Sequence, residues 1–577
     1  MENLKEKTAR GLMWGAVNNG TMQVLNLLIG ILLLRHLTPG DTGLVGMLAI
    51  FSAIAGNLQS SGFSTALINE RQPTAAQYNS VFWFNILMGT ALYCLLFAAA
   101  PLIAQFFRQP QLTRLARFLF LSFFISSFGI ATNAYMMKNM MNREITIVNL
   151  TALVLSGTVA IVMVFKDYAY WSLAWQQVVN SVVLVVGRFC YVKWRPSLSS
   201  LHAPLSTFRY IRQTFSFSMK ILVTMIVNTV NQNMLTVIFG RLFRDARVVG
   251  NFFQAYKWDS MAFQTVGGML AQVAQPVLVS VRDERDRELQ VFRKMLRFTS
   301  FLSFPALFGL ALVSREFILC TIGPAWTDCI PLLQILCISG AFMPLFTLYQ
   351  NLVISHGRSD VNMWLNIGQI ALQLVIILLF YRQGIVMMVV AYTLFNIIWL
   401  AAWQPFARRI IGLRWLDLLR DTVPFMLIAA IVMLATYLLT NYLSTLIPQL
   451  STLIPQPSTL IPQPSTLIPQ PSTLIPQLST LNPQPSTLIP QLSTLNPQPS
   501  TLIPQPSTLI PQPSTLNPQP STLIPQPSTL IPQLWLLLAT RVVLAAALYY
   551  AVMRLLHVAI LQECLQFITR KFRKNSI

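Results

Sequence analysis

Acidic residues are scarce in this sequence, where 18 Asp and Glu stand against 40 Lys and Arg in 577 residues. Charged residues together make up only 10% of the chain, whereas 54% is hydrophobic and the mean hydropathy is +0.58. A soluble globular domain is excluded, because its core could not hide so much apolar surface. The net charge of +22 does not indicate nucleic acid, because the basic residues lie in short loops between apolar segments.

Residues for catalysis and metal binding are also few. The four histidines are far apart, and the six cysteines form no CxxC pair. The sequence lacks the GxxxxGK[ST], GxSxG and HExxH motifs. We therefore expect no enzyme activity, no ATP motor within this chain, no cofactor and no metal. Cys320 and Cys329 flank one loop and could pair there, although buried thiols are the favoured interpretation.

Long apolar segments fill most of the chain. Each could cross a bilayer as a helix, and hydropathy predicts about 14 of them. The predicted fold class is an all-α polytopic membrane protein with about 14 transmembrane helices, arranged as two six-helix lobes plus two C-terminal helices. Lys and Arg concentrate in the loops that share a side with the N-terminus, so we expect both termini in the cytoplasm.

A polar stripe marks the first helix of each predicted lobe. The stripe in the second lobe consists of Lys220, Thr224, Asn228 and Asn231. About 205 residues earlier, the corresponding places are held by Gly15, Asn19, Gln23 and Asn26. This spacing puts each set on one helical face, which should look into a protein interior or a watery cavity. Two alternatives stay open: the amides could join helices by hydrogen bonds, and the lysine could reach the membrane interface.

The internal repeat extends into the loop that follows each of these helices. Leu34–Gly46 resembles Phe239–Gly250, with Gly46 matched to Gly250 after one gap. Both copies start from the same side of the membrane, so the repeat is parallel. The predicted domains are an N-terminal six-helix lobe (1–196), a C-terminal six-helix lobe (197–412), transmembrane helix 13 (413–443), a repeat loop (444–534), and transmembrane helix 14 with a basic cytoplasmic tail (535–577).

The segment 444–534 is a heptapeptide array with the unit STLIPQP, in about 13 uncharged copies. Proline in every copy opposes both a helix and a sheet ladder. We expect this segment to be extended and largely unstructured. The near-identity of its copies is typical of the expansion of a short repeat rather than of a functional module.

The second helix of each predicted lobe is the least apolar one. In the second lobe it carries Lys257 and Asp259, which are two residues apart and so point in different directions. Lysines surrounded by Asn and Gln suit a ligand with sugar hydroxyls and a phosphate anion. A duplicated helix bundle with such an interior predicts a transporter.

Several short motifs resemble those of one family. They are Gly11 and Trp14; Arg35-x-Leu37-x-Pro39-x-Asp41-x-Gly43-Leu44; Gly62-Phe63-x-x-Ala66-Leu67; Tyr78-Asn79-Ser80-Val81-Phe82-Trp83; Ala100-Pro101-x-Ile103-Ala104-x-Phe106-Phe107; and Gln275-Pro276-Val277-Leu278-x-Ser280-x-x-Asp283. Over residues 1–443 the chain resembles the polysaccharide (O-antigen and colanic-acid-like) flippases of the multidrug/oligosaccharidyl-lipid/polysaccharide exporter superfamily. Lys138 and Asn142 depart from the usual pattern, outside the polar interior.

The resemblance implies a lipid flippase of the bacterial cytoplasmic (inner) membrane. It would move undecaprenyl-pyrophosphate-linked polysaccharide repeat units from the inner to the outer leaflet by alternating access. The implied partners are this lipid-linked oligosaccharide, the bilayer and other membrane proteins of polysaccharide assembly, without nucleic acid. We assign the pyrophosphate to Lys220 and Lys257, and ion coupling to Asp259. We assign the sugars to Asn19, Gln23, Asn26, Asn228 and Asn231.

Two other functions remain open at this point. A cation-coupled multidrug exporter has the same fold, but embedded acids would suit it better than lysines. A membrane polysaccharide polymerase or ligase would need a large outer loop with catalytic Arg or His, and would not need two matching lobes.

Overall fold

The computed structural model describes most of the chain outside the heptapeptide array. The described residues are 20–60, 67, 70, 73–196, 204–243, 245–453, 527–556, 558 and 560–562, and the side chains at 60, 204–221, 224, 271–273, 276, 444–453 and 527–531 are not among them. Met1–Thr440 and Ile531–Ile577 form one compact unit, and Asn441–Leu530 form a second. Asn19 and most of the array therefore lie outside the described residues, as does the side chain of Lys220.

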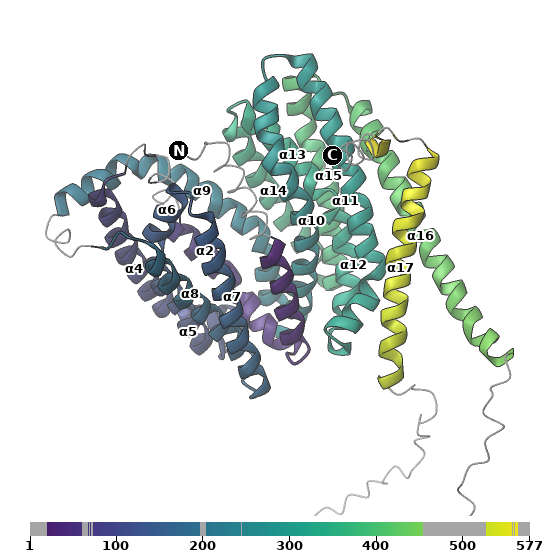
Figure 1. The fold of residues 1–577 in the computed structure, drawn as a ribbon, viewed down its shortest axis with the longest axis horizontal. Helices are drawn as coiled ribbons and strands as arrows, with labels where there is room; N and C mark the ends of the chain where they lie inside the picture. Colours follow the sequence, from purple (N-terminus) through teal and green to yellow (C-terminus); the bar gives the residue numbers. More distant parts are fainter. Residues whose placement is uncertain are drawn as a thin grey trace, which may run out of the picture. The chain divides into compact units, whose positions relative to one another are not determined.

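Every regular element in the described part of the chain is a helix (Figure 1). After a short helix, Gly20–Leu34, the chain forms α2 (Pro39–Ser60), α4 (Ala75–Phe107), α5 (Leu112–Ser127), α6 (Ile130–Lys138), α7 (Asn142–Phe165), α8 (Trp171–Tyr191), α9 (Pro204–Phe243), α10 (Ala246–Val281), α11 (Arg285–Thr321), η2 (Pro324–Trp326), α12 (Cys329–Gly340), α13 (Met343–Ser355), α14 (Ser359–Phe380), η3 (Tyr381–Gln383), α15 (Ile385–Ile411), α16 (Trp415–Leu453) and α17 (Pro527–Leu555). The predicted all-α class is confirmed. The helices α16 and α17 run into the first and last repeats, which the sequence predicts to be extended.

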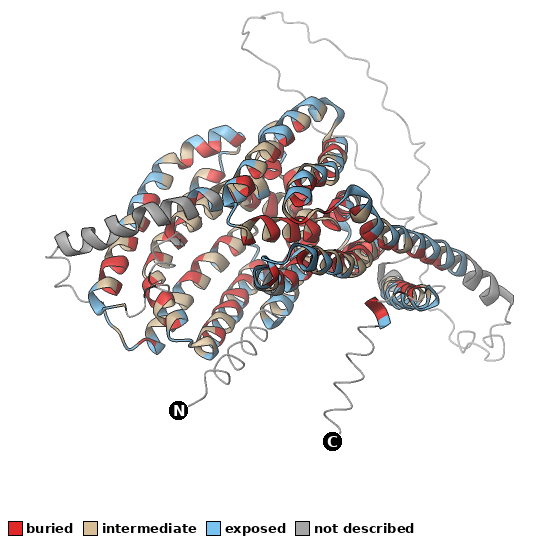
Figure 2. Ribbon diagram, turned by 90° about the horizontal axis from the view of Figure 1, so that it is seen from above, coloured by how far each residue is buried: buried red, intermediate tan, exposed pale blue. Residues whose placement is uncertain are grey.

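Length and hydropathy identify 10 membrane-spanning helices among the described residues, or 11 if the bent pair α5 and α6 crosses once. The remaining predicted spans correspond to α9, α10 and the Gly20–Leu34 helix, and part of each of these lies outside the residues or side chains that the structure describes. The chain is thus a multi-pass membrane protein, and the count of about 14 stays a prediction. Buried residues follow the faces that the helices turn to one another, and exposed residues lie on the outer faces (Figure 2).

The loop before α2 shows why its motif reads Thr-Pro-Gly-Asp. The Thr38 backbone N–H donates to the Asp41 carboxylate at 2.9 Å, and the Asp41 N–H donates back to the Thr38 hydroxyl at 3.4 Å. This reciprocal pair is a capping box, and Pro39 occupies the first helical position, where its missing N–H costs nothing. At the start of α10, the Asp245 side chain accepts from the Arg247 N–H at 2.8 Å. Thr38 therefore caps α2 with Asp41 in its first turn, whereas Asp245 itself caps α10.

The beginnings of α2 and α10 touch through their backbones at two glycines. A Cβ added to Gly43 would overlap the carbonyl oxygen of Ala246, and a Cβ added to Gly250 would overlap that of Pro39. Pro39 and Ala246 are the first residues of their helices, so the contact is reciprocal. The sequence match pairs Gly250 with Gly46 instead, a register of 204 residues (250 − 46), whereas the contact sets a register of 207 (250 − 43).

Side chains join the same end of the bundle to α11. The Arg35 guanidinium donates at 2.7 Å to each of the carbonyl oxygens of Cys320 and Thr321, in the last turn of α11. The Trp326 indole N–H donates to the Leu34 carbonyl oxygen at 3.0 Å. A cation suits the negative end of a helix dipole, so the guanidinium stabilises this junction. Cys320 and Cys329 are both free and buried, in agreement with the favoured interpretation.

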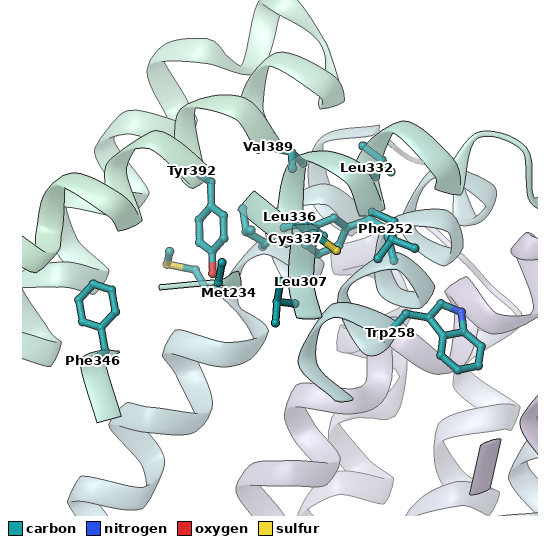
Figure 3. Close-up of a cluster of buried hydrophobic side chains, with 14 of the residues drawn as sticks. Met234, Phe252, Trp258, Leu307, Leu332, Leu336, Cys337, Phe346, Val389 and Tyr392 are labelled. Carbon is teal, nitrogen blue, oxygen red and sulfur yellow. The ribbon is translucent and has the colours of Figure 1, made fainter. Parts of the chain in front are cut away.

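The helix α10 packs against α2, α9, α11, α12 and α13. Figure 3 shows part of the core beside it, in which α10 contributes Phe252 and Trp258. The Trp258 ring lies edge-on to Phe317 of α11, with centroids 5.1 Å apart. Aromatic packing of this kind fixes the rotation of α10 about its axis, and with it the directions of its polar side chains.

One buried and one half-buried ion pair attach the last two helices of the compact unit. Arg541 of α17 lies 2.8 Å from Glu316 of α11, and both side chains are almost fully buried, at 6% and 4% exposure. The Arg541 guanidinium also donates to the Thr440 hydroxyl at 3.2 Å. On α11, Arg293 contacts Asp421 of α16 at 2.6 Å. These pairs hold α16 and α17 against α11, although a 91-residue array (444–534) separates the predicted helices.

We expect Gly250→Ala to destabilise the protein by about 1–3 kcal/mol, because the new methyl group forces α2 and α10 apart. Thermal unfolding of the purified protein in detergent measures this. Gly268→Ala on the same helix is the matched control, because a Cβ there meets open space. Equal unfolding temperatures for the two variants would show that the helices do not approach so closely.

We expect Arg541→Gln to cost about 3–5 kcal/mol, because it leaves the Glu316 carboxylate buried without its partner. The double variant Glu316→Gln with Arg541→Gln removes both charges and should recover most of the loss. Thermal unfolding again provides the measurement. A double variant no more stable than Arg541→Gln would contradict the ion pair as the cause.

Candidate functional site: two polar cavities on one helix

A cavity of about 440 Å³ lies among the Gly20–Leu34 helix, α2, α7, α8 and α10, and we call it the lysine cavity. Its polar lining consists of Asn26, Thr42, Ser156, Gln176, Gln177, Asn180, Gln254 and Lys257. Its volume is in the range of small-molecule sites. Helices of both predicted lobes contribute to the lining, so neither lobe forms this cavity alone.

Helical spacing explains how the side chains reach this cavity. Gln254 and Lys257 are three residues apart on α10 and therefore share a face. Gln254 is 2% exposed, and its Nε2 atom has no hydrogen-bond partner in the described part of the protein. The Lys257 side chain is exposed to the cavity, and no salt bridge to it is found among the described residues. The cavity thus has one ammonium group that is free to attract an anion.

A second cavity, of about 220 Å³, lies among α9, α10, α12, α13, α14 and α15, and we call it the aspartate cavity. Its polar lining consists of Asn228, Asn231, Gln232, Tyr256, Asp259, Ser339, Thr347, Gln350, Asn366, Gln369 and Tyr392. Figure 3 shows Tyr392 and Phe346, which line this cavity from α15 and α13. Asp259 is the one acidic residue in this lining.

Asp259 is 2% exposed, and its Oδ1 atom has no hydrogen-bond partner among the described residues. The helix α12 passes close to it at Gly340, where any Cβ would overlap Oδ1. Asn366 donates to the Asn228 side chain across this cavity at 3.4 Å. The Cys337 thiol is a hydrogen-bond partner of the Asp259 carboxyl group, and no salt bridge to Asp259 is found among the described residues. A buried carboxylate without a countercharge costs free energy unless it is protonated or a cation lies beside it.

The structure distributes the residues predicted from the sequence over the two cavities. Asn26 and Lys257 line the lysine cavity, whereas Asn228, Asn231 and Asp259 line the aspartate cavity. This is the divergence that a spacing of two residues between Lys257 and Asp259 predicts. Gln23 is exposed and lines neither cavity.

The sequence reasoning missed two sets of polar residues. On α8 these are Gln176, Gln177 and Asn180, and on α14 they are Asn362, Asn366, Gln369 and Gln373. The α14 set has spacings of four, three and four residues, so the criterion that found the stripe on α9 would also have found it. The apolar residues between these amides are sufficient to predict a spanning helix, so hydropathy alone does not reveal the polar face.

Two solved structures define the class of the fold. The chain is similar to the lipid II flippase MurJ in its inward closed conformation, with a TM-score of 0.56 and 14% identity over 74% of this chain and 92% of that one. It is also similar to an inward-facing multidrug resistance transporter of the MATE family in the MOP superfamily, with a TM-score of 0.52 and 16% identity over 68% of this chain and 94% of that one. The fold is that of the transporters of this superfamily.

Sequence relatives narrow the class to a family. The profile of the family described as "Polysaccharide biosynthesis protein" matches residues 32–331, which is more than half of the sequence. The chain therefore belongs to the polysaccharide biosynthesis protein family, in agreement with its motifs. It is 25% identical to the lipopolysaccharide biosynthesis protein WzxC of Escherichia coli K12 over 63% of this chain and 73% of WzxC. It is 25% identical to the teichuronic acid biosynthesis protein TuaB of Bacillus subtilis 168 over 72% of this chain and 83% of TuaB.

Proposed function

We propose that this protein is a flippase for lipid-linked oligosaccharides. It moves undecaprenyl-pyrophosphate-linked polysaccharide repeat units from the inner to the outer leaflet of the bacterial cytoplasmic membrane, with both termini in the cytoplasm. It is a transporter and not an enzyme. The observation that carries the proposal is the lysine cavity, where one ammonium group and five amides meet in a bundle with a transporter fold.

The two kinds of polar group in the lysine cavity have separate tasks. Lys257 binds the pyrophosphate, because an ammonium group donates charge-assisted hydrogen bonds to phosphate oxygens. Asn26 binds sugar hydroxyls, since an amide both donates and accepts. Lys220, Asn19 and Gln23 keep the roles that the sequence suggested, as further phosphate and sugar contacts.

The aspartate cavity serves ion coupling in this proposal. Asp259 binds a proton or a metal cation, and amide oxygens of Asn228 and Asn231 are suitable further ligands for a cation there. The sequence assigned these two amides to sugars, but their position in the lining of the cavity that contains Asp259 favours the cation. Differential binding of the cation in two states of the protein would then drive the transport cycle.

The contacts of Arg35, Gly43, Gly250 and Trp326 suggest which state this is. They join the predicted lobes at the end where α2 and α10 begin. With both termini in the cytoplasm, this end faces outward, so the outer entrance is closed. Alternating access requires these contacts to break when the substrate leaves toward the outer leaflet.

A cation-coupled multidrug exporter is the alternative function, and the buried Asp259 is the observation that favours it. Lys257 argues against it, because an ammonium group in the cavity repels the cationic compounds that such exporters carry. The two functions are distinguished by the sign of the charge that the lysine cavity attracts.

We expect Lys257→Gln to lower export about tenfold to hundredfold, because a charged hydrogen bond to the phosphate is lost. Lys257→Arg should keep much of the activity, and Lys257→Glu should be worst because it repels the anion. The measurement is surface polysaccharide in a flippase-null bacterial strain complemented with each variant, with protein level followed by immunoblot.

The matched control is Lys193→Gln, which removes an exposed lysine outside both cavities and should leave export unchanged. Full export by Lys257→Gln and Lys257→Glu at normal protein level would eliminate the phosphate role. Export of a cationic dye that rises in Lys257→Glu would favour the drug exporter.

We expect Asp259→Asn to preserve folding, because an amide of the same shape replaces a carboxyl group that is buried without a salt bridge among the described residues. The variant should lose the acceleration of transport by an imposed proton or sodium gradient in proteoliposomes. Asp360→Asn, in the exposed first turn of α14, is the control. A gradient response of normal size in Asp259→Asn would remove this residue from ion coupling.

A further inference from the structure

The helix α8 forms one wall of the lysine cavity, but none of its residues takes part in the proposed binding of pyrophosphate or sugar. Gln176 and Asn180 are four residues apart, so they lie one turn above the other on the same face. Within the part of the chain that the structure describes, neither side chain makes a hydrogen bond to the protein. Their neighbour Gln177 donates to the Ser122 hydroxyl at 3.4 Å, at the long limit for such a bond.

Gln254 completes this arrangement from α10. It is almost fully buried, lines the same cavity and has no partner for its Nε2 atom among the described residues. A buried polar group without a partner costs free energy, and proteins rarely keep one without a reason. A ligand with hydroxyl groups would satisfy the amides on both walls at once.

The amides of α14 show what structural amides look like in this protein. Gln369 and Gln373 both donate to the Asn396 side-chain oxygen, at 3.1 and 2.7 Å, and so join α14 to α15. Gln176 and Asn180 differ, because they form no such bond to another described helix. Helix-to-helix hydrogen bonding therefore does not account for them.

We propose that Gln176 and Asn180 of α8, with Gln254 opposite, form a saccharide-binding subsite that recognises the sugar next to the pyrophosphate. The inference rests on the proposed function, and it assigns specificity to residues beyond those that hold the phosphate. Paired amides both donate to and accept from hydroxyl groups. Lys257 is the one charged residue in the lining of this cavity, so the subsite favours a neutral sugar over a cationic one.

Binding of two defined lipids to the purified full-length protein in lipid nanodiscs tests this subsite. One probe is undecaprenyl pyrophosphate alone, and the other carries a neutral disaccharide of an N-acetylhexosamine and a hexose. We expect the wild-type protein to bind the disaccharide probe more tightly. The double variant Gln176→Ala with Asn180→Ala should bind that probe about tenfold more weakly, which is about 1.4 kcal/mol, and the bare lipid within about twofold of wild type.

Val182→Ala is the matched control, because it shortens an exposed apolar side chain on the same helix. It should bind both probes like the wild type. Lys257→Gln should weaken both probes, since both carry the pyrophosphate.

The outcomes separate this inference from the proposed function. Unchanged binding of both probes by the double variant would overturn the subsite and leave the flippase proposal standing. An equal loss of affinity for both probes would assign the two amides a structural role and would also overturn the subsite. Failure of the wild-type protein to bind either probe would overturn both proposals.

Discussion

The structure depends on one physical constraint, which is that the polar side chains of α10 cannot face lipid. Hydrocarbon solvates neither an ammonium group nor a carboxylate, so Lys257 and Asp259 require protein or water around them. Five helices pack against α10 and provide this enclosure. Two of them come unusually close because glycine is present at the contact, α2 at Gly250 and α12 at Gly340. Lys257 and Asp259 of α10 then reach the two cavities between these helices.

Side chains of one helix, α10, line both cavities. Lys257 and Asp259 are two residues apart, a rise of about 3 Å along the axis, so α10 cannot move one without moving the other. In the proposed function, a cation in the aspartate cavity would favour one position of α10, and an anion in the lysine cavity would then bind with a different affinity. Such coupling would be reciprocal, so the substrate would also change the affinity for the cation. A link between the two cavities through α10 would need no wider network of residues.

The sequence predicts which face of a helix is polar better than it predicts which helices pack against that face. The spacing of Asn228 and Asn231 correctly put them on the side of α9 that lines a cavity. It could not reveal that Lys257 lies in another cavity, because helical periodicity contains no information on the neighbours of a face. The count of about 14 spans stays a prediction, because 10 or 11 are identified among the described residues. The helices α9 and α10 carry many polar residues, and other helices pack against both of them.

The internal repeat contains a useful asymmetry. The reciprocal contact of Gly43 and Gly250 sets a register of 207 residues between α2 and α10, in which Lys257 corresponds to Ile50 and Asp259 to Ser52. Both charges therefore belong to one copy of the helix. The lysine cavity combines this charged copy with amide walls from the first half of the chain, at α8 and the Gly20–Leu34 helix. In the proposed alternating-access cycle, a rocking of the two halves would separate the Lys257 ammonium group from the amides, and this separation would lower the affinity for a ligand that contacts both. Loss of affinity on opening is what a transporter needs to release its substrate, and a site contained within one half would not provide it.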